Sequence, residues 1–156
     1  MRGNPTVIKN FQDALPLEAH LNLQYRMNAR LLRFDGLKKL GNKFTGFADD
    51  AHSWLKAVTN QLLFLSGDGT GSPYQPAPVG QPGSVTAIIT DSLAMVVQIC
   101  DLYETNVVTA SAAKDDLSRN LWEHLIKWHR DHQQWFEKQL RLIATLTEKD
   151  YIAEKL

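Results

Sequence analysis

Three residues with chemically active side chains occupy positions that helical periodicity assigns to a buried face: Glu18, His129 and His132. The two histidines are three residues apart, so they project from the same face of one helix. Burying an unpaired carboxylate is costly, and Glu18 therefore needs a partner. One carboxylate with a His-x-x-His pair is a ligand set that can hold a single divalent transition metal, with coordination positions left open. A buried Glu–His hydrogen bond without any metal is the alternative.

The other histidines and the cysteine give weaker signals. His20 and His124 are interpreted as surface or interface residues. Cys100 lies midway along an apolar helical stretch without a basic neighbour that would activate its thiol. We expect it to be a small buried hydrophobic residue and not a nucleophile.

Turn-forming residues show which elements carry these side chains, because five of the nine glycines and four of the six prolines fall within residues 66–84. On either side, apolar residues recur at steps of three and four, which is typical of amphipathic helices, and no sustained alternation predicts a strand. Asn4 before Pro5 is a helix start signal, whereas Pro16 should bend its helix or remove one hydrogen bond. The expected helices run from Asn4-Pro5 to Asp35-Gly36, from Leu37 or Asn42 to Ser66, from Ser84 to Ala112, from Asp116 or Ser118 onward, and, capped by Thr147, from Glu148 to Leu156.

The long connection determines the expected topology. Four helices of about 25 to 30 residues make rods of about 40 Å. A connection of about 18 residues can span about 55 Å, so the second and third helices can run parallel. The sequence therefore predicts an all-α, ferritin-like four-helix bundle with one long crossover at about 66–84 and a short C-terminal helix, as a single domain over residues 1–156. A flexible linker between two helical hairpins is the alternative, but it would leave aromatic stripes exposed.

Composition excludes several classes of protein. Seventeen basic and seventeen acidic residues give no net charge, which argues against nucleic-acid binding and against a disordered acidic tail. The start of the chain does not have the form of a signal peptide, and no apolar run reaches the roughly 18 residues of a membrane span. With one cysteine and no internal disulfide, a reducing cytoplasm is the expected location. We expect neither a nucleic acid nor a membrane partner.

The sequence resembles the bacterioferritins over nearly its whole length, with one small insertion in the crossover. No single motif is decisive, and the likeness lies in their order and spacing. They are Met1-x-Gly3 with Val7-Ile8, Gln24-Tyr25 with Ala29-Arg30, Gly36-Leu37-Lys38, Leu63-Phe64-Leu65-x-Gly67, Ser118-Arg119, and Trp135-x-Glu137-x-x-Leu140-x-Leu142-Ile143 leading to Tyr151.

The resemblance implies a di-iron centre with six ligands. Helices one and three each supply one glutamate, and helices two and four each supply a Glu-x-x-His pair. In this chain only the first glutamate and the last histidine are kept, one glutamate has become histidine, and three positions have no ligand atom. In chain order the six positions are Glu18, Ala51, Trp54, Val96, His129 and His132.

Both bridging carboxylates are therefore absent, and the resemblance implies a protein that has lost ferroxidase activity. The expected centre is a repacked core in which Glu18 and His132 bond to each other or to Tyr25. The alternative is a mononuclear site of Glu18, His129 and His132 that binds one Fe, Zn or Mn ion and serves iron homeostasis.

His52 falls on the position of the methionine that binds haem at the bacterioferritin dimer interface. Histidine is a competent axial ligand, so a haem shared by two subunits is one hypothesis for this position. Polar neighbours, including Asn22, Arg26 and Asp49, favour instead an exposed or interface histidine. The resemblance also implies a homo-oligomer, either a dimer or a ferritin-like shell, acting as a non-catalytic subunit.

Overall fold

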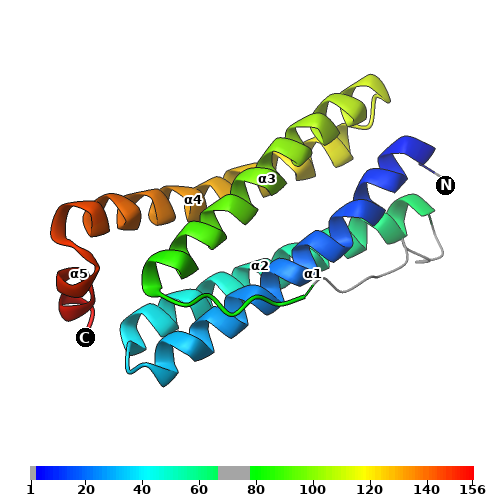
Figure 1. Cartoon of the computed structure of the whole chain (residues 1–156). Coiled ribbons are helices and arrows are strands. Elements are labelled where there is room, and N and C mark those ends of the chain that lie inside the picture. Colours follow the sequence, from blue (N-terminus) through cyan, green and yellow to red (C-terminus); the bar gives the residue numbers. More distant parts are fainter. Residues whose placement is uncertain (1–2, 67–77) are drawn as a thin grey trace.

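The computed structural model describes residues 3–66 and 78–156, and every regular element in these ranges is a helix (Figure 1). The all-α prediction is confirmed, and the helix boundaries agree with the expected ones to within a few residues. The elements are α1 (Pro5–Phe34), α2 (Lys38–Ser66), α3 (Val85–Ala112), α4 (Asp116–Leu146) and α5 (Glu148–Glu154).

Capping side chains fix where the long helices begin. The Asn4 side chain accepts a hydrogen bond from the Thr6 amide at 2.9 Å, and Ser84 Oγ accepts one from the Ala87 amide at 3.0 Å. α1 continues through Pro16, which has no N–H to donate at that turn. Gly36, at a φ of +85°, reverses the chain between α1 and α2 because glycine adopts this left-handed conformation without steric cost.

The helices form two antiparallel hairpins, α1 with α2 and α3 with α4, and α2 runs parallel to α3 (Figure 1). The ferritin-like bundle topology is confirmed. Of the crossover predicted at 66–84, residues 67–77 lie outside the described residues. The described part, 78–84, runs back beside α1, where the Gln24 side chain bonds both backbone groups of Gly80: Nε2 donates to the carbonyl at 2.9 Å and Oε1 accepts from the amide at 2.7 Å.

The bundle interior is rich in aromatic rings, and Phe11 stacks on Trp122 with 4.1 Å between ring centroids. By length and composition alone α3 could span a membrane, but in this bundle it contributes ten buried residues to the packed interior. α5 closes one end of the bundle, because Glu148 accepts hydrogen bonds from the amide and hydroxyl of Thr86 at 2.9 and 2.8 Å.

Candidate functional site

A hydrogen-bonded triad from three helices lies at the centre of the bundle. Glu18 of α1 accepts through Oε1 from the hydroxyl of Tyr103 on α3 at 2.7 Å, and the same oxygen lies 2.7 Å from Nε2 of His129 on α4. All three side chains are fully buried. The single carboxylate of Glu18 therefore serves two donors, and His129 is the partner that its burial requires.

His132 lies one turn further along α4 and pairs outward, not with Glu18. Its Nε2 is 2.8 Å from Oδ2 of Asp50 on α2, a carboxylate whose side chain is 55% exposed. Burial lowers the pKa of His132, while the hydrogen bond and charge of Asp50 partly oppose that shift. The expected Glu18–His132 bond is thus wrong: the inner partner of Glu18 is His129, and His132 marks the outer edge of the centre.

Tyr25 is close to this centre but bonds neither Glu18 nor His132, which corrects the second expectation. Its hydroxyl is buried without a hydrogen-bond partner among the described residues. Burial and, secondarily, the charge of Glu18 raise the pKa of Tyr25 well above its usual value, and the same two causes act on Tyr103. Both phenols therefore remain protonated at neutral pH.

Trp54 of α2 fills the space between the two histidines. Its ring centroid is 4.4 Å from that of His129 and 4.8 Å from that of His132. Ala51, one turn earlier on the same helix, and Val96 on α3 are also completely buried. The centre is therefore packed with hydrocarbon and indole at three positions where the resemblance implies iron ligands.

Several buried atoms with hydrogen-bonding capacity stay unpartnered within the described residues: Oε2 of Glu18 and Nδ1 of both His129 and His132. In the described part of the chain, no three His, Cys, Asp or Glu side chains are arranged so that they could hold one metal ion. The structure brings Glu18 and His129 into contact and places His132 on a different carboxylate.

Comparison with known proteins gives one consistent family. The family model described as a ferritin-like domain matches residues 8–146. The chain belongs to the ferritin family. A bacterioferritin from Brucella melitensis is 26% identical over 97% of this chain and 92% of its own, and one from Streptomyces coelicolor is 26% identical over 98% and 90%. The fold of Mycobacterium tuberculosis bacterioferritin superposes with a TM-score of 0.94 at 20% identity, covering 100% of this chain and 97% of the other. The resemblance to bacterioferritins is thereby confirmed.

The residues of this ferritin-family chain do not fit a di-iron group. A methyl, an indole and an isopropyl group stand at Ala51, Trp54 and Val96, and none of them supplies a ligand. Oε1 of Glu18 is already engaged by Tyr103 and His129, which leaves only Oε2 of that carboxylate. No reaction step through two irons follows from this donor set.

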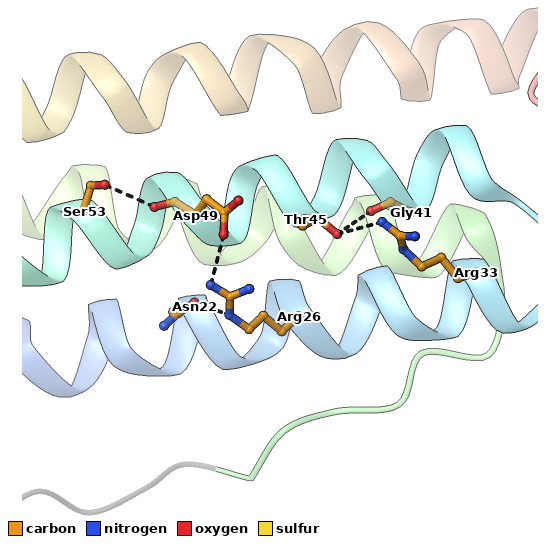
Figure 2. A network of polar contacts seen from close by, with 7 residues as sticks. All are labelled: Asn22, Arg26, Arg33, Gly41, Thr45, Asp49 and Ser53. Atoms are coloured by element: carbon orange, nitrogen blue, oxygen red, sulfur yellow. Dashed lines mark hydrogen bonds and ion pairs between the residues drawn. The ribbon is translucent and has the colours of Figure 1, made fainter.

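A haem at His52 does not fit the geometry of its surroundings either. His52 is exposed on α2, and one turn before it Asp49 Oδ1 forms an ion pair with Nη2 of Arg26 on α1 at 3.1 Å, while Arg26 Nε also bonds Asn22 (Figure 2). Figure 2 shows this polar network bridging α1 and α2. Charged groups paired to each other make a poor surface for an apolar macrocycle.

The remaining sequence interpretations have mixed outcomes. Cys100 is buried as expected, and burial raises the pKa of its thiol to about 11. His124 is exposed and lies 2.8 Å from the Asn120 carbonyl, whereas His20 is half-buried. Asp50 and Tyr103 were not identified as site residues from the sequence. Tyr103 had a detectable signal, its place on the inner face of its helix, but no local pattern marks Asp50.

Proposed function

We propose that this chain is a ferritin-like subunit without ferroxidase chemistry, which acts in the cytoplasm through assembly into a homo-oligomer, either a dimer or a shell. The observation that carries the proposal is the triad of Tyr103, Glu18 and His129, with Trp54 packed beside it. This arrangement engages Oε1 of the one retained carboxylate with groups of the protein itself.

The loss of charge explains why ferroxidase chemistry does not fit. Two ferrous or ferric ions need several carboxylates to neutralise them and to bridge them at a fixed separation. Here Glu18 is the one carboxylate among the six implied positions, and His129 replaces a bridging glutamate with a neutral or cationic ring. One carboxylate, hydrogen-bonded to His129 through Oε1, supplies less negative charge than a pair of irons needs.

Exposed apolar side chains on the outer helices support assembly. On α1, Leu23 and Met27 are 45% and 38% exposed, and on α2, Leu63 and Phe64 are 43% and 60% exposed. Exposed apolar side chains of this size become buried where protein chains associate. Val108 on α3 and Leu117 on α4 are also exposed, at 69% and 61%, so these side chains support self-association without selecting one face.

A mononuclear metal site at Glu18, His129 and His132 is the second candidate. It is favoured by the three buried lone-pair atoms that lack partners, Oε2 of Glu18 and Nδ1 of both histidines. Occupancy would require His132 to leave Asp50 and turn inward. We therefore place it second, as the binding of one Fe, Zn or Mn ion in the service of iron homeostasis.

Iron oxidation tests the first proposal directly. The oxygen-dependent absorbance rise after adding Fe²⁺ should not exceed that of buffer for the natural chain. The restored variant A51E/W54H/V96E/H129E supplies the missing ligands and serves as the positive control if it folds, as judged by circular dichroism. Saturable, catalytic iron oxidation by the natural chain would overturn the proposal.

Metal binding and assembly need separate measurements. Elemental analysis of untagged protein and titration calorimetry with Fe²⁺, Zn²⁺ and Mn²⁺ should show no stoichiometric ion. One ion per chain that is lost in H129Q and H132Q would establish the second candidate in place of the first.

Light scattering coupled to size-exclusion chromatography should show an oligomer, and a monomer at micromolar concentration would contradict assembly.

A further inference from the structure

A hollow of about 240 Å³ lies between α2 and α4, on the outer side of His132. Two tryptophans and two aspartates contribute most of its wall. Trp54 and Trp128 have nearly parallel rings, with 6.2 Å between centroids and 8° between planes. The lining residues are Asp50, Trp54, Trp128, Asp131 and His132.

The adjoining hollow, which shares Asp50, Asp131 and His132, shows what such a surface accepts. There the ammonium group of Lys43 lies over two aromatic rings, 5.2 Å from the centroid of Phe47 and 5.6 Å from that of Trp135. A cation over an aromatic face is attracted by the negative charge density of the ring. The two adjoining hollows together form one groove between α2 and α4. In the half beside Phe47 and Trp135, the chain itself supplies the cation, Lys43.

The other half, beside Trp54 and Trp128, also combines aromatic rings with carboxylates, but no described residue supplies a cation to it. No lysine or arginine of the described ranges lines it. The exposed side chain of Asp131 has no hydrogen bond or ion pair to another described residue, and Asp50 uses only Oδ2 on His132. Two carboxylates beside two indole rings therefore form a negative, aromatic hollow.

We propose that this hollow binds a small organic cation that carries an alkylammonium group. The cationic head lies against Trp54 and Trp128, where indole is the strongest aromatic partner for a cation. Asp50 and Asp131 supply the opposite charge at the rim. An inorganic ion fits less well, because metals require several oxygen or nitrogen ligands converging on one point and no such group of three exists among the described residues.

Choline and its uncharged isostere 3,3-dimethyl-1-butanol provide a matched pair of probes for the full chain. Choline chloride replaces sodium chloride at constant total chloride, while tryptophan fluorescence and calorimetry record binding. We expect saturable binding of one choline per chain with a change in tryptophan emission, and no saturable signal from the alcohol.

Variants assign the signal to this hollow. Asp131→Asn should weaken choline binding about fivefold, since it removes one rim charge and keeps the shape. Trp128→Leu should weaken it further by removing an indole face. Asp91→Asn, an exposed aspartate of α3 outside the hollow, is the control and should bind as the natural chain does.

The inference would be overturned by no saturable choline binding, by equal binding of the neutral alcohol, or by equal loss in the Asp91 and Asp131 variants. Binding of Mg²⁺ in place of choline would make the hollow an inorganic cation site and would also overturn it. None of these readouts depends on iron oxidation or on oligomer size, so the two proposals fail independently.

Discussion

Glu18 and His129 are 111 residues apart in the chain, yet Oε1 of one lies 2.7 Å from Nε2 of the other with both side chains fully buried. The Tyr103 hydroxyl donates to the same oxygen. Because all three side chains are removed from water, the Tyr103 hydroxyl and the His129 ring depend on Oε1 of Glu18 for the hydrogen bonds that water would otherwise supply. Removing one member should therefore cost more than removing all three.

Glu18→Leu should lower the free energy of unfolding by about 3 to 5 kcal/mol, because it leaves a buried histidine and a buried phenol without an acceptor. Adding His129→Leu and Tyr103→Phe to the same chain should recover much of that loss, since no buried polar group is then stranded. Urea denaturation at fixed protein concentration measures both. His124→Gln changes an exposed residue of α4, the helix that carries His129. Its free energy of unfolding should stay within about 0.5 kcal/mol of that of the natural chain. Additive losses from the three substitutions would contradict the coupling.

The Gln24 side chain holds the end of the crossover against α1 through two bonds to the backbone of Gly80. Gln24→Ala should cost about 1 to 3 kcal/mol, because a partly buried amide and carbonyl lose their partner. Thermal unfolding measures the change. The exposed Gln98→Ala on α3 is the matched control and should have a far smaller effect. Equal melting temperatures for the two variants would show that this tie is dispensable.

Helical periodicity and the placement of glycine and proline were sufficient to predict the bundle. They reflect local physics: apolar residues at steps of three and four define one buried stripe per helix, and caps such as Asn4 and Ser84 set the helix starts. The length of the crossover then selects the parallel arrangement of α2 and α3. These features depend on neighbours in the chain and can therefore be recognised in the sequence alone.

The partners within the centre could not be predicted in the same way. Periodicity placed Glu18, His129 and His132 on inner faces, and all three are buried. Which pairs form depends on the axial offset and rotation between helices, to within a fraction of a turn. In the structure Glu18 lies level with His129, and His132 lies opposite Asp50. Asp50 is exposed, and no local sequence pattern marks it as a site residue.

Cys100 is buried in α3, and burial raises the pKa of its thiol to about 11. Since the thiolate is the reactive form, the native chain should hardly react with Ellman's reagent at pH 8. Full reaction should follow on unfolding in guanidinium chloride. The rates of reaction of the native and the unfolded chain, followed by the absorbance of the released thiol reagent, check the expectation. Rapid reaction of the native chain would mean that α3 opens readily at this point.

Glu148 ties α5 to the start of α3, and its hydrogen bonds from the Thr86 amide and hydroxyl lower its pKa below the ordinary 4.5. A carboxyl with a lowered folded-state pKa stabilises the fold above its unfolded pKa, and this contribution is lost as the pH falls through the folded value. Glu148→Gln should therefore destabilise the chain by about 1 kcal/mol at pH 7, a modest amount because the site is only partly buried. The difference in melting temperature between the two chains should shrink between about pH 5 and pH 3. Glu154→Gln, an exposed change in the same helix, should show no such trend. A difference that stays constant with pH would mean that Glu148 acts through shape and not through charge.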